Sequence, residues 1–460
     1  MLVKEIDYFK DIFPAYPHQR EWMQAFFSGK YQFYMENIHR RGGKDATFFN
    51  SAWLYASMVP GNYIYTLPKI GQAKNVIWEG TDLNGRRWID TIPQHLLAGP
   101  PNKSERKIYF TSGSMLHITG ADSILGAHLG SNLHGAFISE FQRTHPSIWD
   151  YLRPIFLRSG GFAAFCYTAL GKGHAYDLFK RNVDNPNWYC RKLTVDDTRD
   201  NNGKYIFSPE QIEEERRSGM DEDLIQQEYY CDENVAVKGT FFAEQLDIAY
   251  KEGRVVENLE IIPYLPVHTS WDLGSRDTNS IWFFQVDKGM FRYFYQHDHN
   301  YGDIDYYGRL LEQVKQKYQF ERYGHHFMPH DVQQTEWATG RTRNVQLMAN
   351  DIRPTVVPRL KVIERVQCAR HVFDKCIFDK NGCKTGLDAL AVARSKWDDK
   401  ARAFTADEVH DWSSHPSAAF QYGHVGWLNS YNKQSLDKQK QYARSREHYK
   451  AQPDVPKLYV

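Results

Sequence analysis

A short basic segment, residues 39–45, has the composition of a phosphate-binding loop. Its sequence is His-Arg-Arg-Gly-Gly-Lys-Asp; it follows the apolar-leaning residues 31–35 and precedes residues 46–55, which have the composition of a helix. Backbone N–H groups at a helix start and a neighbouring lysine ammonium together bind nucleotide phosphates. The segment therefore predicts an ATP site, with the candidate residues Arg40, Arg41, Gly42, Gly43, Lys44 and Asp45.

This loop departs from the usual G-x-x-x-x-G-K-[ST] pattern at two positions. Ile38 stands where the first glycine is expected, and Asp45 replaces the hydroxyl residue that faces Mg²⁺. A carboxylate can hold Mg²⁺ directly or through water, because hard cations prefer oxygen ligands. Asp45 is thus predicted to be a metal ligand, although a basic surface turn would explain this segment alone equally well.

Three further segments fit an ATPase. Residues 135–140 form an apolar strand ending in Glu140, which is predicted to polarise the attacking water. Ser139 stands where an acid would order Mg²⁺, so Asp45 is expected to take a larger share of metal positioning. A strand running into a Gly-rich turn at 166–174 predicts nucleotide sensing, with Thr168 as the coupling residue. Upstream, Gln19 is predicted to contact the adenine edge.

A second block of the chain has the element order of a ribonuclease-H-like domain. Three consecutive strands begin near residues 267, 280 and 290, a helix covers 304–318, and a fourth strand ends before Asp331. In that fold the first and fourth strands are neighbours, so Asp272 and Asp331 are expected to share divalent metals roughly 4 Å apart. A third ligand is expected from Asp411 or His415, although polar residues before a helix would explain that segment equally well.

Composition and pattern together predict an α/β protein with two main domains. The chain has 460 residues and a formal net charge of +1, so a DNA-binding surface would have to be local. Its six cysteines fit neither a zinc ribbon nor a compact disulfide frame, and no apolar run of membrane-spanning length occurs, so we expect a soluble intracellular protein. The expected boundaries are 1–240 for a P-loop ATPase domain with a mostly parallel sheet, 241–262 for a connector, 263–425 for the nuclease domain and 426–460 for a basic, mobile tail.

Taken in order, these segments resemble the large terminase subunit of tailed bacteriophages. The matching pieces cover roughly residues 16–423 and are His39-Arg-Arg-Gly-Gly-Lys-Asp, Tyr65-Thr-Leu-Pro with Gln72-Ala-Lys, Phe137-Ile-Ser-Glu-Phe, residues 146–154, Tyr167-Thr-Ala-Leu-Gly-Lys-Gly-His, Trp271-Asp-Leu-Gly, Pro329-His-Asp, Thr339-Gly-Arg-Thr-Arg and His410-Asp-Trp-Ser-Ser-His. No single piece is decisive, and the ordered set carries the resemblance.

The resemblance implies a motor that uses ATP and Mg²⁺ to translocate double-stranded DNA into a procapsid, joined to a metal-dependent nuclease that cuts concatemers, in which Mn²⁺ can substitute. It also implies a homo-oligomeric ring docked transiently on the portal protein, a small terminase subunit as partner, no membrane, and a place in the host cytoplasm rather than in the mature virion. By this resemblance Lys44, Arg41 and Asp45 serve phosphates and Mg²⁺, Glu140 the water, and Asp272 and Asp331 the nuclease metals.

The sequence departs from the terminase pattern at two places. Leu125 stands where the family often has an arginine that reaches a neighbouring subunit's nucleotide, which leaves Arg143 and Arg153 as candidates. Ala418 stands where an aspartate usually closes the nuclease site, so either Asp411 substitutes for it or the nuclease is inactive, whether the alanine is natural or an introduced Asp→Ala change. Two other functions therefore stay open: a helicase-like DNA translocase, and an ATP-binding assembly scaffold with an inactive nuclease-like domain.

Overall fold

The protein consists of two compact units. Its structure, a computed structural model, describes residues 13–82, 85–127, 132–234, 239–274, 278–300, 304–333, 342–398 and 403–430. The first unit comprises Met1–Glu244, Asp388–Arg402 and Val409–Ser413, and the second comprises Gln245–Leu387, Ala403–Glu408 and Ser414–Val460. Short pieces from beyond residue 387 thus belong to the first unit, whereas the sequence suggested a first domain at 1–240, followed by a connector at 241–262.

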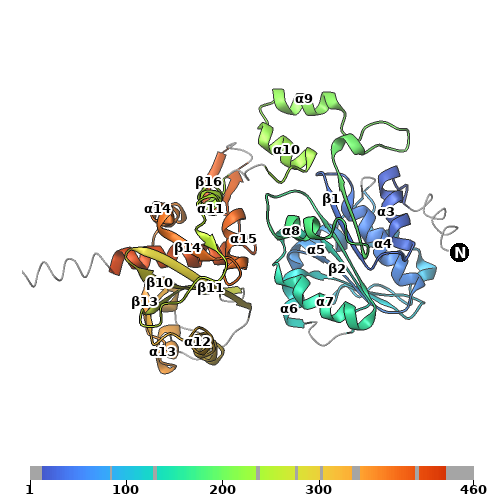
Figure 1. Ribbon diagram of the computed structural model, residues 1–460. Coiled ribbons are helices and arrows are strands. Elements are labelled where there is room, and N and C mark those ends of the chain that lie inside the picture. Colours follow the sequence, from blue (N-terminus) through green and yellow to red (C-terminus); the bar gives the residue numbers. More distant parts are fainter. Residues whose placement is uncertain are drawn as a thin grey trace, which may run out of the picture. The chain divides into compact units, whose positions relative to one another are not determined.

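The first unit is built on a seven-stranded sheet in the order β3-β4-β2-β5-β6-β1-β7, in which only the β3–β4 pair is antiparallel (Figure 1). Its strands are β1 (Phe33–Ile38), β2 (Asn62–Leu67), β3 (Lys107–Tyr109), β4 (Met115–Gly120), β5 (Gly135–Ser139), β6 (Phe162–Tyr167) and β7 (Trp188–Leu193). Its helices are α3 (Pro17–Phe27), α4 (Lys44–Met58), α5 (Ile70–Ala73), α6 (Ala121–Ala127), α7 (Ser147–Ser159), α8 (His174–Asn182), α9 (Pro209–Arg217) and α10 (Glu222–Tyr230).

Helices cover both faces of this sheet, so its central strands are buried on both sides. Side chains of α3 and α4, such as Trp22 and Phe48, pack with Phe137 on one face. Side chains of α7 and α8, such as Trp149 and Leu178, pack with Phe165 on the other. A parallel sheet covered on both faces explains why β1, β5 and β6 are buried along their whole length, without alternation between buried and exposed positions. The predicted P-loop ATPase fold with a mostly parallel sheet is confirmed.

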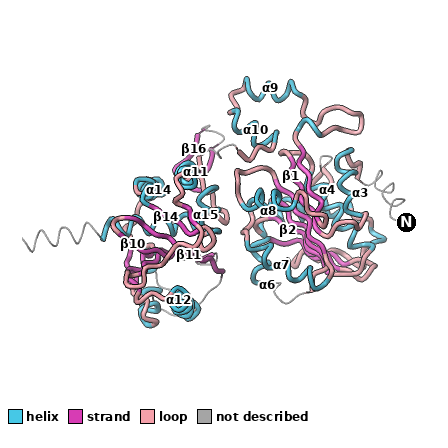
Figure 2. Tube along the Cα trace, in the orientation of Figure 1, coloured by secondary structure: helices cyan, strands magenta, loops and turns pink. Residues whose placement is uncertain are grey.

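The second unit has a mixed sheet in the order β13-β12-β9-β10-β11-β14-β8, visible as the second group of magenta strands in Figure 2. Its strands are β8 (Val255–Val256), β9 (Val267–Asp272), β10 (Thr278–Asp287), β11 (Met290–Asn300), β12 (Tyr323–Met328), β13 (Pro354–Val356) and β14 (Cys376–Asp379). Strands β9, β10 and β11 form an antiparallel meander, and β12 pairs parallel to β9. This is the predicted ribonuclease-H-like topology, and it is confirmed.

Helices also cover both faces of the second sheet. The first face carries α12 (Ile304–Tyr318) and α13 (Arg343–Ala349), which pack with β9 and β10. The second face carries a helix at residues 414–430, in which Phe420 packs against Trp282 of β10 and Tyr293 of β11. The remaining elements beyond residue 240 are α11 (Ala243–Lys251), α14 (Val362–His371), α15 (Lys384–Val392), β15 (Ser395–Asp398) and β16 (Ala403–Glu408).

Two expected segments differ in detail from the structure. The connector expected at 241–262 contains α11 and strand β8, which pairs with β14. The tail expected from 426 begins inside a helix that continues to residue 430, and residues 431–460 lie outside the described part of the chain. No helix in the described ranges has both the length and the apolar character needed to cross a lipid bilayer.

Candidate functional site

The predicted ATP-site residues meet at one edge of the first sheet. The loop at 39–45 follows β1, Glu140 follows β5, and Thr168 follows β6, which lies between β1 and β5. These strands are parallel and in close register, with Asn37 opposite Tyr167 and Ser139 opposite Cys166. Because parallel strands end at the same edge, segments far apart in sequence are brought together there.

The loop needs both of its glycines. Gly43 has a φ of 82° and precedes the first residue of α4, and a Cβ there would lie 2.4 Å from Gln19 Nε2. A Cβ on Gly42 would lie 2.7 Å from Ile38 Cδ1. Larger residues would therefore displace the loop from the start of α4, where backbone N–H groups are available for an anion.

Two buried side chains of α3 hold the loop carbonyls. His18 Nε2 lies 2.9 Å from Gly42 O, and Gln19 Nε2 donates to Gly43 O at 3.2 Å. Gln19 Oε1 accepts from the backbone N–H of Tyr16 at 2.8 Å. The structure thus places Gln19 against the loop as a brace, and its contact with an adenine edge stays a prediction.

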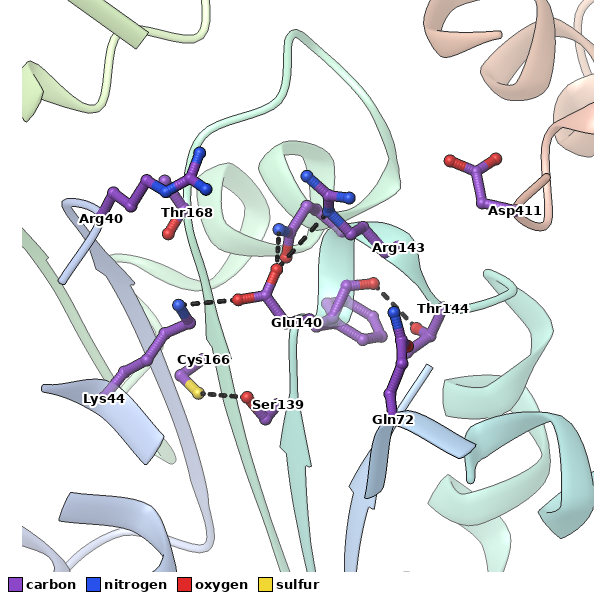
Figure 3. A network of polar contacts seen from close by, with 12 residues as sticks. Arg40, Lys44, Gln72, Ser139, Glu140, Arg143, Thr144, Cys166, Thr168 and Asp411 are labelled. Carbon is purple, nitrogen blue, oxygen red and sulfur yellow. Dashed lines mark hydrogen bonds and ion pairs between the residues drawn. The ribbon is translucent and has the colours of Figure 1, made fainter. Parts of the chain in front are cut away.

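Lys44 and Glu140 form an ion pair at the centre of the site, with Lys44 Nζ 2.7 Å from Glu140 Oε1 (Figure 3). Burial opposes the charged form of Glu140, but the Lys44 ammonium and the Arg143 guanidinium overcome it and lower the Glu140 pKa to about 2. Burial likewise opposes the charge of Lys44, and the carboxylates of Glu140 and Asp45 more than compensate and raise its pKa. Both groups therefore stay charged at neutral pH.

The two candidate trans-acting arginines occupy different environments. Arg143 Nε lies 3.5 Å from Glu140 Oε2 of its own chain. Arg153 lies on α7 with an exposed side chain. Arg143 is thus part of the site within one subunit, whereas Arg153 is exposed on α7. The side chain at position 125 lies outside the described part of the structure.

A cavity of about 820 Å³ opens over these residues. The predicted residues in its lining are Gln19, Arg40, Arg41, Gly43, Lys44, Asp45, Glu140, Arg143 and Thr168. Apolar and aromatic side chains, including Phe13, Tyr16 and Trp88, complete the wall. A volume in the range of ordinary ligand sites, lined by both charged groups and aromatic rings, suits a nucleotide with its phosphates on the loop.

Asp45 is fixed by two hydroxyl groups. Ser139 Oγ donates to Asp45 Oδ1 at 2.6 Å, and Tyr65 OH donates to the same oxygen at 2.8 Å. Ser139 and Tyr65 are fully buried. The sequence singled out Asp45 and Ser139 separately, whereas their direct contact required the fold.

In the second unit, Asp272 and Asp331 lie at the ends of adjacent parallel strands. Asp272 closes β9, and Asp331 lies in a short helix, His330–Gln333, just after β12. His415 Nδ1 lies 2.7 Å from Asp272 Oδ2, so the predicted Asp272 and His415 are brought together. Asp331 contacts His330 Nε2 at 3.1 Å. Both aspartates help to raise the pKa of the buried Tyr422 to about 12, after the larger effect of burial.

Asp411 makes its described side-chain contacts within the first unit. Asp411 belongs to the first unit, where its Oδ2 lies 3.2 Å from Arg394 Nη1 and its Oδ1 accepts from Ser413 Oγ at 2.6 Å. Ala418 is buried in the 414–430 helix, one turn after His415. Within the described ranges, no three His, Cys, Asp or Glu side chains are arranged to hold a metal ion.

One contact of the first unit was not anticipated. Trp412 Nε1 donates to the carbonyl oxygen of Gln142 at 3.3 Å, and the Trp412 ring packs edge-on against His174. Gln142 follows Glu140 by two residues, and its side-chain amide donates to Glu140 Oε2 at 2.9 Å. Trp412 lies inside a motif that the sequence flagged, but only the fold shows that this residue contacts the loop after Glu140.

Comparison with known proteins finds neither a matching family model nor a matching curated protein. Several solved structures are similar. One is the large terminase of a thermophilic bacteriophage in complex with ADP, at 15% identity and a TM-score of 0.40, covering 89% of this chain and 98% of that chain. A second is the ATPase domain of the large terminase of Thermus phage P74-26, at 17% identity and a TM-score of 0.35, covering 49% and 97%.

A third is the large terminase nuclease of the thermophilic phage G20c with bound cobalt, at 14% identity and a TM-score of 0.29, covering 41% of this chain and 97% of that chain. These three similar structures are all of large terminases of phages.

Proposed function

We propose that this chain is a viral DNA-packaging motor, in which the first unit hydrolyses ATP to translocate double-stranded DNA and the second unit cuts it. The observation that carries the proposal is the Lys44–Glu140 pair at 2.7 Å, beside a glycine loop at a helix start and under a cavity of about 820 Å³. Phosphate binding needs a lysine beside the loop, and water activation needs a carboxylate close to it.

In the ATPase reaction the loop N–H groups and Lys44 bind the phosphates and neutralise charge that develops on them. Glu140 orients the attacking water, because a carboxylate that stays ionised can accept a hydrogen bond from it. Lys44 must turn from Glu140 toward the nucleotide, which exchanges one charge partner for another. Asp45 is the residue that would hold Mg²⁺, which supplies charge neutralisation at the phosphates when bound. Thr168 is the coupling residue.

In the nuclease reaction Asp272, Asp331 and His415 would hold divalent metal ions, with Asp411 as the alternative third carboxylate. Their residue types fit Mg²⁺ or Mn²⁺, because carboxylates suit hard cations and an imidazole suits softer ones. Such ions clamp the attacking and leaving oxygens of a phosphodiester. The chain's own part is to bring carboxylates from β9 and from the segment after β12 to one edge of the sheet.

The wider setting belongs to the same proposal. The motor would act as a homo-oligomeric ring on the portal of a procapsid, with a small terminase subunit recruiting DNA in the host cytoplasm. An arginine from a neighbouring subunit would complete each ATP site. The exposed Arg153 suits that role better than Arg143, which contacts Glu140 of its own chain.

The test measures ATP hydrolysis with and without procapsids and DNA, alongside nicking of supercoiled plasmid in Mn²⁺. We expect Mg²⁺-dependent turnover that procapsids and DNA stimulate. No turnover under any of these conditions would refute the motor and leave the ATP-binding scaffold.

A second candidate is a DNA translocase without nuclease activity. It is favoured by one observation, namely that no three-residue metal cluster lies within the described ranges of either unit. Normal packaging of DNA supplied at genome length, with no nicking in Mn²⁺, would select this candidate over the two-activity motor.

A further inference from the structure

The pair Asp45–Ser139 is the inverse of the pair expected at these positions. In the usual loop the residue after the lysine is Ser or Thr, and the acid that positions Mg²⁺ ends the neighbouring strand. Here the carboxylate is on the second residue of α4, and the hydroxyl ends β5 just before Glu140. Each arrangement provides one carboxylate and one hydroxyl.

The two side chains are in direct contact, so the exchange preserves a physical pair. The Ser139 Oγ to Asp45 Oδ1 distance is 2.6 Å, which is typical of a charge-assisted O–H···O⁻ hydrogen bond. Tyr65 donates to the same oxygen at 2.8 Å. Both described hydrogen bonds therefore fall on Oδ1, and Asp45 also lines the cavity beside Lys44.

Because position 139 is buried, the pair at positions 45 and 139 needs one charged group and one neutral hydrogen-bond donor. Ser139 is fully buried, and Cys166 Sγ lies 3.6 Å from its hydroxyl. Two carboxylates at this separation, one of them at the fully buried position 139, would repel each other. Two hydroxyls would leave no anionic oxygen for a hard cation. Either single replacement should therefore damage a site that the exchanged pair tolerates.

We propose that Asp45 and Ser139 form the metal-positioning pair of this site, with the carboxylate and the hydroxyl at exchanged positions. Asp45 gives its carboxylate to the nucleotide-bound Mg²⁺, and Ser139 orients that carboxylate. Mg²⁺ usually binds proteins through one or two carboxylates plus substrate phosphates, with several waters kept. A single carboxylate beside a phosphate loop meets that need. Ser139 is then a positioning residue, and this inference rests on the proposed ATPase function.

The test compares the wild-type chain with Asp45→Ser, with Ser139→Asp and with the double exchange Asp45→Ser/Ser139→Asp. Mn²⁺ binding in the presence of ADP, followed by electron paramagnetic resonance, reports the metal site without requiring turnover. We expect each single variant to bind Mn²⁺ at least tenfold more weakly, and the double exchange to recover affinity to within a few-fold of wild type. ATP turnover should likewise be highest in the wild type, close to it in the double exchange and lowest in the two single variants.

Two further variants protect the test against misfolding. Asp45→Asn keeps an acceptor for Ser139 and Tyr65 while it removes the charge, so it should stay folded and lose Mn²⁺ binding. Ser139→Ala should keep the carboxylate and weaken Mn²⁺ binding by about 10- to 100-fold, as loss of an orienting group commonly does. Binding of metal-free ADP, held by the loop and Lys44, should change little in Ser139→Ala.

The outcomes separate the inference from the function on which it rests. Wild-type protein that neither binds ADP nor hydrolyses ATP overturns the ATPase itself. Wild-type turnover combined with a double exchange no better than the weaker single variant overturns only the exchanged pair. Normal Mn²⁺ affinity in Asp45→Asn also overturns it, because the metal would then take its anionic oxygen from another residue.

Discussion

Replacing Glu140 with glutamine should stop ATP turnover without weakening nucleotide binding. The substitution preserves the shape of the side chain and removes the carboxylate that lies 2.7 Å from Lys44 Nζ. Loss of a group that orients or accepts a proton from the attacking water typically costs about 10²- to 10⁴-fold in rate. This corresponds to about 3 to 5 kcal/mol of activation free energy.

The structure also sets the expected effect on binding. Burial raises the Glu140 pKa, and nearby cations, Lys44 first among them, lower it; the net pKa of about 2 against 4.5 corresponds to about 3 kcal/mol favouring the ionised form. An incoming phosphate must compete with Glu140 for the ammonium. Removing that competitor should leave the Kd for ATP unchanged or up to about tenfold lower.

The measurement combines steady-state ATP hydrolysis with titration of a fluorescent ATP analogue. Glu105→Gln is a matched control, because Glu105 also pairs with a lysine, at 3.0 Å from Lys107 Nζ, but lies outside the cavity lining. Wild-type turnover in Glu140→Gln would refute its role with the water. A Kd raised more than tenfold would refute the competition between Glu140 and phosphate for Lys44.

Four other outcomes are expected. Lys44→Ala should abolish turnover and, unlike Glu140→Gln, weaken ATP binding at least tenfold in the same titration, because it removes the phosphate-facing charge; unchanged affinity would contradict this. The second unit should lose stability as pH falls from 6.5 toward 4, because burial lowers the pKa of four of its histidines to about 3 or 4, namely His268, His297, His326 and His424. The unfolded chain then binds protons at a higher pH than the folded one, which costs about 1.4 kcal/mol of stability per pH unit for each histidine. A denaturant midpoint that does not change over this pH range would contradict the prediction. Truncation after residue 430 should leave basal ATPase activity unchanged and impair packaging. Truncation after residue 425 should also destabilise the second unit, because it removes Trp427, whose ring lies 5.0 Å from that of His268. Unchanged packaging by the protein truncated after 430 would argue against a role for the tail. Ala418→Asp should create or strengthen Mn²⁺-dependent nicking of plasmid, and strong nicking by the unchanged chain that is lost in Asp411→Ala would instead make Asp411 the third ligand.

The sequence by itself determined the fold class and most elements of both units. The apolar run before Glu140 predicted a strand, because a doubly covered parallel sheet needs continuous burial. The order of three strands, helix 304–318 and a further strand predicted the second topology, because that pattern is local in the chain. The loop glycines and Lys44 were recognisable because backbone geometry and phosphate charge restrict which residue types fit.

Tertiary structure alone decided which candidates meet. Ser139 and Asp45 are separated by 94 positions and contact each other only because β5 and the start of α4 reach the same edge of one sheet. The same holds for His415 with Asp272, and for Trp412 with Gln142. Asp411 and His415 are neighbours in sequence, yet they belong to different units, because the chain passes from one unit to the other between Ser413 and Ser414. The hydrophobic pattern of a short segment predicts its secondary structure. A functional site instead depends on contacts between segments that are distant in sequence, and these contacts are set by how the helices and strands pack.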